Sequence, residues 1–461
     1  MRIRLRDCAL ATTAILSSLR HVAAISLDPT DPDSVKSAAS TAAHSMMQWY
    51  GGNLTGGTPG LLGGPYYWWE AGAMWGALID YWYYTGDDTY NDVVTQALQF
   101  QVSPTKDYMP ANQTTDEGND DQIFWGFAVM TAAEYKFPNP PADQPQWLAL
   151  AQGVWNSQQA RWDTSTCNGG LRWQIFTFDT GYTYKNSPSN AGFINLGARL
   201  YAYTGNQTYA NWVNRAWDWM EGVLLISNFG EGPGYGIYDG VYDTNNCTTI
   251  TFLQWTYSAG MLLNTAAVMY NITGDPIWET RLYGIWNSSN IFFYNNTILW
   301  EQACERPGGV CDLNELSFKS YFARYMAAST KWVPALLDIF TPFFQSSATA
   351  AAAQCVGTIA GLYGNACGFS WTNGTWDGTY GVGQQLDAMQ IFMANIVQDA
   401  RSPVTRKTGG TSTGDPSAGT SSNTGIGAPT TPITTASRAG AGILTAFVVV
   451  SWLGAIWWMY V

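Results

Sequence analysis

Histidine is nearly absent, since the 461 residues include only two, His21 and His44. Serine and cysteine nucleophiles usually depend on a histidine base, and catalytic zinc sites usually take histidine ligands. Both kinds of site are therefore difficult to build from this chain. His44 falls in the first expected helix, where we assign it a structural role.

Charge is also scarce. Only 12% of the residues are charged, the net charge is -13, and no basic patch stands out, which disfavours nucleic acid as a partner. No Walker loop or GxGxxG motif follows an expected strand, so no cofactor is expected. No metal-ligand spacing is present, although scattered carboxylates leave calcium binding open. Aromatic residues are abundant instead, with 23 Trp and 26 Tyr, and such rings suit the apolar faces of sugars as well as a large core.

The two ends of the chain predict export and anchoring. Residues 1–24 combine a basic start, an apolar middle and small residues, as signal peptides do. Residues 402–440, rich in Ser, Thr, Gly and Pro, predict a flexible O-glycosylated stalk. Residues 441–461 are apolar with no basic residue after them, which favours a GPI signal over a retained transmembrane helix, with Asn423 as candidate attachment residue. The folded domain is expected at 25–401, at the cell surface.

The cysteines agree with an oxidising compartment. Of seven, Cys8 leaves with the signal peptide, and the remaining six allow fifteen pairings. We favour the two pairs that are near in sequence, which joins the remaining two to each other: Cys304 with Cys311, Cys355 with Cys367, and Cys167 with Cys247. Sequons predict surface glycosylation at Asn53, Asn112, Asn206, Asn246, Asn271, Asn287, Asn295 and Asn373.

One connector recurs along the chain, at residues 83–92, 202–211 and 271–280. Each copy has an apolar segment ending in Thr-Gly, with Asp or Asn immediately after it. Glycine supplies the left-handed residue that ends one helix, and Asp or Asn caps the next. The repeat therefore predicts a series of tight αα-hairpins.

Two classes of helix alternate through these hairpins. Six are apolar on nearly every side and are expected to begin near Tyr67, Asp120, Pro188, Gln254, Glu315 and Gly383. Six are amphipathic and are expected to begin near Pro32, Tyr90, Gln144, Gln207, Pro276 and Trp332. Buried helices alternating with half-exposed ones predict an all-α fold, an (α/α)6 toroid with an inner and an outer ring.

Long loops lead into the inner helices, while short connectors leave them, so function is expected at the inner-helix N-termini. The residues that gather there include aromatic rings, amides and carboxylates, which suit a carbohydrate. As substrate-binding candidates we take Trp68, Trp69, Glu70, Asn190, Gln254, Trp255, Lys319, Gln384 and Asp387.

Asp120 and Asp121 open the second inner helix and are the catalytic candidates. Glycoside hydrolysis needs two carboxyls, about 5 Å apart in retaining enzymes, and adjacent positions at a helix start can present them at roughly that separation. Two charges about 5.5 Å apart repel by about 3 kcal/mol at an effective dielectric near 20, more than the ~0.3–1 kcal/mol that a helix terminus gives each anion. One carboxyl should then be protonated and the other ionised. Asp87 and Asp88 are also adjacent but lie in a short Thr-Gly connector, so we interpret them as structural.

The segments GNDDQIFWG after YMPANQT, WWEAGAMWGAL, NGGLRW and SNAGFINLGARL resemble glycoside hydrolase family 76, and in particular its fungal GPI-anchored cell-wall members. The resemblance covers about residues 30–400. It implies an (α/α)6 barrel that acts on α-1,6-mannosidic linkages with retention, with Asp120 as nucleophile and Asp121 as general acid/base. It also implies α-1,6-mannan or a GPI-core mannoside as substrate, with transfer to a glucan acceptor as an alternative to hydrolysis. Separately, we expect the working unit to be a monomer.

Two other interpretations stay open. A catalytically silent wall lectin or scaffold would use the same aromatic cleft without turnover. A different (α/α)6 carbohydrate enzyme, such as an inverting hydrolase or a lyase, is disfavoured by the scarcity of histidine and by the paired aspartates.

Overall fold

The computed structural model describes residues 25–111, 113, 117–227 and 234–420, together with 442, 445, 448, 449, 451 and 452. The expected signal peptide, the sequon at Asn112 and the attachment candidate Asn423 lie outside the described residues. Within the described residues, no helix has both the length and the apolar character needed to cross a bilayer.

Six helices form the inner ring of a barrel. Each packs against the next, and the last packs against the first, which closes the ring. They are α2 (Trp68–Thr85), α4 (Asn119–Tyr135), α6 (Ser187–Thr204), α8 (Thr256–Thr273), α11 (Phe318–Trp332) and α13 (Val382–Ala394). All of α4 except Asp121 is buried, as its apolar sequence predicts.

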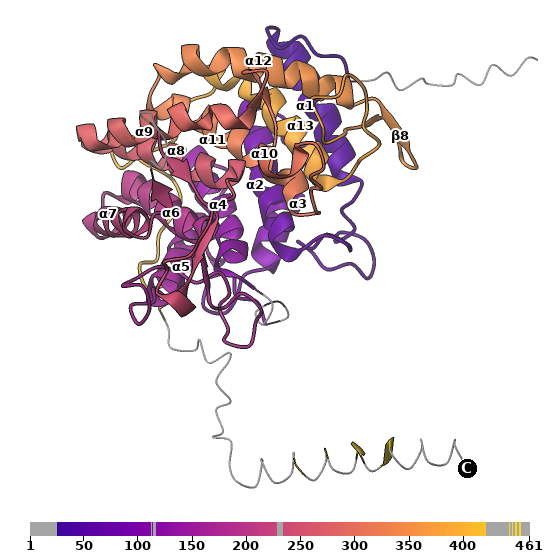
Figure 1. Cartoon of the computed structure of the whole chain (residues 1–461). Helices are drawn as coiled ribbons and strands as arrows, with labels where there is room; N and C mark the ends of the chain where they lie inside the picture. Colours follow the sequence, from indigo (N-terminus) through magenta and orange to yellow (C-terminus); the bar gives the residue numbers. More distant parts are fainter. Residues whose placement is uncertain are drawn as a thin grey trace, which may run out of the picture.

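Six further helices form the outer ring, and Figure 1 shows α12, α9, α7 and α5 at the edge with α11, α8, α6 and α4 nearer the middle. The outer helices are α1 (Pro32–Met47), α3 (Asn91–Phe100), α5 (Trp147–Ala160), α7 (Gln207–Gly222), α9 (Pro276–Ser288) and α12 (Leu336–Gln354), and a short α10 (Gln302–Glu305) lies in a loop. The predicted (α/α)6 toroid is confirmed.

The Thr-Gly connectors form the expected hairpins at one end of the barrel. Gly86, Gly205 and Gly274 end α2, α6 and α8 with left-handed φ of 81°, 71° and 68°. The threonine of each copy also has a role, because its hydroxyl accepts the N–H of the Asp or Asn two residues later at 3.1 Å. Asp87 accepts the Thr89 N–H at 3.0 Å, which fits its structural interpretation.

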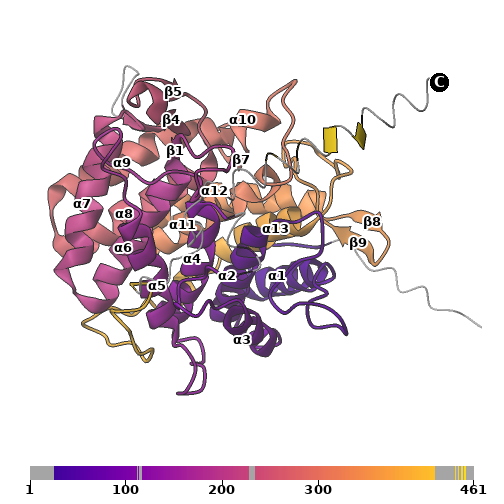
Figure 2. The ribbon, with the colours of Figure 1, turned by 90° about the horizontal axis from the view of Figure 1, so that it is seen from below.

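The opposite end carries the long loops, and the sequence did not predict the short strands in them. β1 (Tyr184–Asn186), β4 (Gly240–Tyr242) and β5 (Ile250–Thr251) form an antiparallel sheet in the order β1-β4-β5, which Figure 2 shows at one end of the helices. Three hairpins accompany it: β2 (Ile226–Ser227) with β3 (Gly236–Ile237), β6 (Phe293–Tyr294) with β7 (Ile298–Leu299), and β8 (Gly357–Ile359) with β9 (Leu362–Ala366). Strands of two or three residues are too short for a periodic pattern to indicate them.

All three predicted disulfides are confirmed: Cys167–Cys247, Cys304–Cys311 and Cys355–Cys367. The first ties the long loop after α5 to the long loop after α7, so it holds two parts of the loop end together.

Buried ion pairs lie near the other end of the inner ring. Arg324 Nε lies 2.7 Å from Asp80 Oδ2, and Arg199 Nη2 lies 2.5 Å from Glu134 Oε2. Both arginines also donate to the Thr131 hydroxyl, at 2.7 and 2.9 Å. Each buried charge therefore has an opposite partner and further hydrogen bonds, as burial of charge requires.

The start of the expected stalk is different from the prediction, because residues 403–420 pack along the outside of the barrel. The N–H groups of Val404 and Arg406 donate to carbonyls of Glu134 and Ala202 at 2.9 Å. Further along, the Ser412 hydroxyl accepts the Leu148 N–H at 2.9 Å. These contacts are made by backbone and small polar groups. Packing of this kind leaves no apolar pattern in the sequence, so the composition does not predict it.

Three backbones cross closely where this segment meets α5. A Cβ at Gly153 would lie 1.9 Å from the Lys106 carbonyl oxygen, and one at Gly419 would lie 2.1 Å from the Gly153 carbonyl oxygen. The Gly419 N–H donates to the Thr105 carbonyl at 2.8 Å, and Lys106 pairs with Asp415 at 2.9 Å. The folded domain therefore extends to residue 420.

We predict that Gly153→Ala loosens this crossing, because the added methyl group collides with backbone that cannot rotate away. The expected cost is about 1–3 kcal/mol, seen as a lower Tm and faster proteolysis within 403–420. Gly222→Ala is the matched control, since a Cβ there meets nothing within 4 Å. Equal behaviour of the two variants would contradict a seated segment.

Candidate active site

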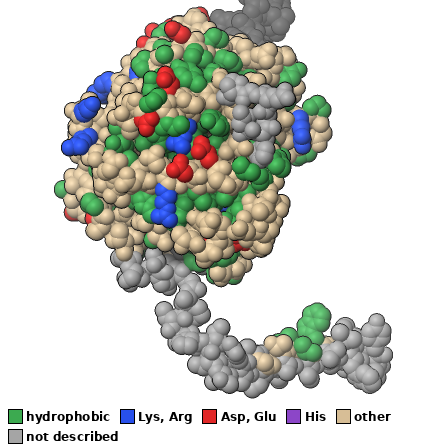
Figure 3. Space-filling view, turned by 60° about the vertical axis from the view of Figure 1, so that its left-hand side comes forward, with side chains coloured by type: hydrophobic (Ala, Val, Ile, Leu, Met, Phe, Trp, Pro, Cys, Tyr) green, Lys and Arg blue, Asp and Glu red, His purple; other side chains and the backbone are tan. Residues whose placement is uncertain are grey.

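A cleft of about 260 Å³ opens at the N-terminal ends of the inner helices. Its lining contains five carboxylates and no lysine or arginine. The lining residues are Trp69, Asp120, Asp121, Phe124, Trp173, Tyr184, Asn186, Asp239, Trp255, Tyr257, Asp312, Asn314, Glu315 and Phe318. On the face of the molecule shown in Figure 3, basic side chains are likewise few and separated.

The start of α4 is fixed to the loop that precedes β1. The Asn119 N–H donates to the Trp173 carbonyl at 2.8 Å, and Gly118 forms a β-bridge with Gln174. Gly118 is required here, because a Cβ would lie 2.5 Å from Asp120 Oδ1 and 3.2 Å from Asp121 Oδ2. Backbone contacts thus set the direction in which both aspartates leave the helix.

The two aspartates accept different donors. Asp120 is buried; its Oδ1 accepts the Asp121 N–H at 3.1 Å, and its Oδ2 accepts the Asn186 side-chain amide at 2.7 Å. Asp121 is half-buried, and its Oδ2 accepts the Gly118 N–H at 2.6 Å. Both carboxyls are therefore oriented before any ligand arrives.

Burial dominates the electrostatics of the pair. It raises the pKa of Asp120 well above its ordinary value, repulsion from Asp121 raises it further, and the Asn186 hydrogen bond lowers it. Burial also raises the pKa of Asp121 to about 6, against a lowering by the Gly118 N–H. Because the two carboxyls are adjacent, ionisation of one opposes ionisation of the other. Such a pair can supply an acid and a nucleophile together.

Aromatic rings form the walls beside the carboxylates. Trp69 packs on Phe124 with ring centroids 4.6 Å apart, and its Nε1 donates to Asn314 at 3.0 Å. Tyr257 stacks on Phe318 at 3.9 Å. These contacts hold the rings rigid, so they present preformed apolar faces of the kind on which sugar rings stack.

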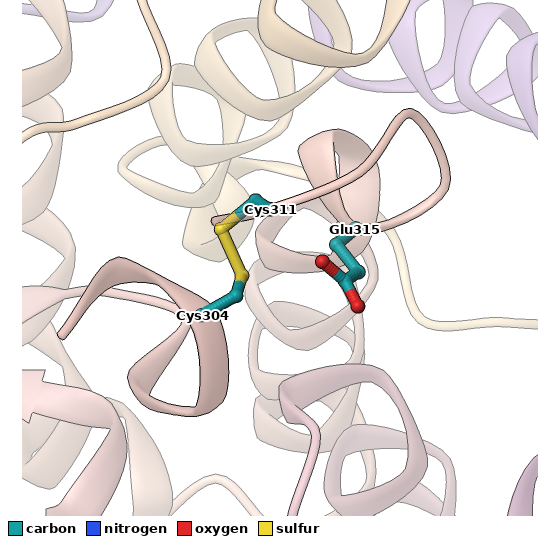
Figure 4. Close-up of side chains that lie close together, drawn as sticks. All are labelled: Cys304, Cys311 and Glu315. Atoms are coloured by element: carbon teal, nitrogen blue, oxygen red, sulfur yellow. A yellow bond between two sulfur atoms is a disulfide. The ribbon is translucent and has the colours of Figure 1, made fainter. Parts of the chain in front are cut away.

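The remaining carboxylates come from loops. Asp239 accepts the Tyr184 hydroxyl at 2.5 Å, and burial raises the pKa of Asp239. Asp312 and Glu315 lie on the segment joined to α10 by the Cys304–Cys311 disulfide, and Figure 4 shows Glu315 beside this disulfide. The three residues Cys304, Cys311 and Glu315 are close enough to suggest a metal site, but both sulfurs are bonded to each other and offer no thiolate.

Four of the sequence candidates line the cleft: Asp120, Asp121, Trp69 and Trp255. The other seven lie outside its lining and are engaged elsewhere. Trp68 stacks on Trp125, Glu70 accepts the Tyr67 N–H, Asn190 bonds the Leu171 backbone, Gln254 accepts the Ile237 N–H, Lys319 pairs with Glu305, Asp387 accepts the Ser320 N–H, and Gln384 is buried.

Several lining residues were not candidates, namely Trp173, Tyr184, Asp239, Asp312 and Asn314. All lie on long loops, where no period relates a position to the cleft. For candidates on a helix, a one-residue step turns the side chain by about 100° around the axis, so neighbouring positions face different directions. Trp68 and Trp69 illustrate it, because only Trp69 faces the cleft.

Comparison with known proteins gives consistent matches. The profile of glycosyl hydrolase family 76 matches residues 34–407. The chain is 45% identical to mannan endo-1,6-alpha-mannosidase DCW1 of Saccharomyces cerevisiae, over 96% of this chain and 97% of that protein. It is 39% identical to mannan endo-1,6-alpha-mannosidase DFG5 of the same yeast, over 96% of each.

Solved structures agree. The crystal structure of Dfg5 from Chaetomium thermophilum in complex with glucosamine has a TM-score of 0.81 and 42% identity, covering 86% of this chain and 98% of that one. A variant α-1,6-mannanase of Salegentibacter in complex with α-1,6-mannotriose has a TM-score of 0.61 at 18% identity, covering 79% and 99%, which supports the fold.

The raised pKa values predict a pH-dependent stability cost. Asp120 and Asp121 have higher pKa values in the folded protein than in the unfolded chain, where the pKa of Asp is about 3.9. The native state therefore binds more protons than the unfolded state between these two pKa values. The free energy of unfolding consequently falls as pH rises from the unfolded pKa to the folded pKa. Replacing both Asp120 and Asp121 by Asn should therefore raise Tm at pH 7 and leave it nearly unchanged at pH 4. Thermal unfolding at both pH values checks this, with the exposed Asp88→Asn as control. An equal gain at both pH values would contradict it.

Proposed function

We propose that this chain, which belongs to glycosyl hydrolase family 76, cleaves α-1,6-mannosidic linkages with retention, using Asp120 as nucleophile and Asp121 as general acid/base. The observation that carries the proposal is the pair of oriented carboxyls, one buried and one half-buried, at the start of α4, in a cleft with aromatic walls and no basic side chain. The linkage comes from the relatives, both named mannan endo-1,6-alpha-mannosidases.

In the first step, a carboxylate oxygen of Asp120 attacks the anomeric carbon of the mannosyl unit. The glycosidic C–O bond breaks, and Asp121 gives its proton to the leaving oxygen. In the second step, Asp121 takes a proton from an incoming hydroxyl, whose oxygen displaces Asp120 from the sugar. The two inversions give net retention.

The incoming group decides the outcome. Water gives hydrolysis, whereas a sugar hydroxyl gives transfer. Rigid rings such as Trp69 and Tyr257 line the cleft and offer stacking faces to an acceptor sugar, which supports transfer to glucan of a GPI-core mannoside. The proposed setting is a monomer at the cell surface, held by a GPI anchor near Asn423, as the apolar end of the sequence indicates.

Asp120→Asn and Asp121→Asn should each lower turnover of defined α-1,6-mannosides by at least about 100-fold without loss of folding, since each removes a group that the first step needs. Product mass analysis measures turnover, with and without a glucan oligosaccharide as acceptor. Asp88→Asn, which changes an exposed aspartate of the other adjacent pair, is the control and should keep wild-type activity.

Proton NMR of the first-formed anomer tests retention. An inverted product would reject Asp120 as nucleophile, and near-normal activity of either variant would reject its assigned role. Glycan binding by the wild-type protein with no turnover of any α-1,6-mannoside would instead support a lectin.

A further inference from the structure

The side chain of Asn186 has a fixed orientation. Asn186 caps α6, and its Oδ1 accepts the Ser189 N–H at 3.3 Å. A backbone N–H can only donate, so the amide oxygen must face Ser189 and the amide nitrogen must face away from it. That nitrogen lies 2.7 Å from Asp120 Oδ2. The cap therefore determines that Asn186 donates to Asp120.

Strand β1 holds Asn186 in place. Asn186 pairs with Gly240 of β4, and its own carbonyl accepts the Asn190 side-chain amide at 2.8 Å. The preceding residue, Lys185, is fully buried, and its Nζ lies 3.0 Å from Asp163 and donates to the Thr166 carbonyl at 2.9 Å. Because side chains alternate along a strand, anchoring Lys185 on one side directs Asn186 to the cleft.

The surrounding loops are locked together on the same side of β1 as Lys185. Arg172 forms ion pairs with both Asp163 and Asp243, so it joins the loop before β1 to the segment after β4. The Cys167–Cys247 disulfide makes a second link between these loops. The amide of Asn186 is therefore presented by a rigid support.

The other groups that face Asp120 do not favour its anion. The titratable residues lining the cleft are acidic or phenolic: Asp121 on α4, Tyr184 on β1, Asp239 beside β4, Tyr257 on α8, and Asp312 and Glu315 on the loop before α11. No lysine or arginine lines the cleft. Among the described residues, Asn186 is the side chain that donates to Asp120, whereas Asp121 accepts from the Gly118 backbone.

We propose that Asn186 is a positioning residue that favours the ionised form of Asp120 and so prepares it to act as the nucleophile. A hydrogen bond to the charged form of an acid favours that form, and bonds to ionised groups are roughly twice as strong as neutral ones. Asn186 therefore acts against the burial and the repulsion that oppose ionisation of Asp120. This role rests on the proposed retaining mechanism.

Asn186→Ser tests the proposal, because a serine hydroxyl can still cap α6 but does not replace the amide donor. The acidic limb of the kcat/KM profile should move up by about one to two pH units, so activity lost at low pH returns as pH rises. Asn186→Asp, which also keeps the cap but adds a negative charge, should move the limb further in the same direction. A uniform loss at every pH, with the limb unmoved, would overturn the proposal.

The control is Asp275→Ser at the N-cap of α9, at the opposite end of the barrel, where Asp275 accepts the Ile277 N–H at 3.0 Å. It should change Tm without moving the pH profile. Equal movement of the limb in this variant would show that Asn186→Ser acts only through helix capping.

A second measurement separates this proposal from the proposed function because it does not depend on turnover. Carbodiimide labels protonated carboxyls, and peptide mass spectrometry distinguishes Asp120 from Asp121. Labelling of Asp120 should persist to higher pH in Asn186→Ser than in the wild-type protein, while Asp275→Ser should label as the wild-type protein does. Unchanged labelling of Asp120 in Asn186→Ser would overturn the role of Asn186 even if α-1,6-mannosides are cleaved, and a shift confined to this variant would uphold it even if they are not.

Discussion

Everything at the cleft depends on keeping two neighbouring carboxyls out of bulk water in a stable arrangement. Burial and mutual repulsion both oppose ionisation of Asp120 and Asp121, and no basic side chain of the cleft lining offsets them. Neutral N–H donors offset the burial and the repulsion instead. They are two backbone groups at the start of α4 and the side-chain amide of Asn186. A positive charge there would favour ionisation of both aspartates more strongly and weaken the acid, whereas neutral donors favour it less.

The two ends of the toroid have different roles: one end stabilises the barrel and the other carries the cleft. Tight Thr-Gly connectors and paired charges such as Arg199–Glu134 stabilise one end without taking part in the site. The loop end is free to carry the irregular segments that a cleft needs, and the Cys167–Cys247 and Cys304–Cys311 disulfides restrain those segments. The rigid inner helices then place Asp120, Trp69 and Phe318, which are distant in sequence, around one cleft.

Prediction from the sequence succeeded where a local rule governs the structure. The twelve helices follow from the period of the apolar residues and from the capping residues. Two disulfides follow from the closeness of their cysteines in the sequence, and the third joins the two cysteines that are left. Family membership follows from segments such as GNDDQIFWG. Prediction was wrong for residues 403–420, because their composition resembles a stalk while their backbone is seated on α5 and its neighbours.

By itself, the sequence determined the architecture, the end of the barrel that carries the cleft, and Asp120 and Asp121 as the pair to examine, because period, caps and local motifs are properties of neighbouring residues. Only the tertiary structure decided which of the other candidates face the cleft: Trp69 and Trp255 do, while Lys319 is buried against Glu305. It also decided what each aspartate touches. Asp120 meets an amide that lies 66 residues away in the chain, and a contact across that separation follows from the closed ring rather than from any local pattern.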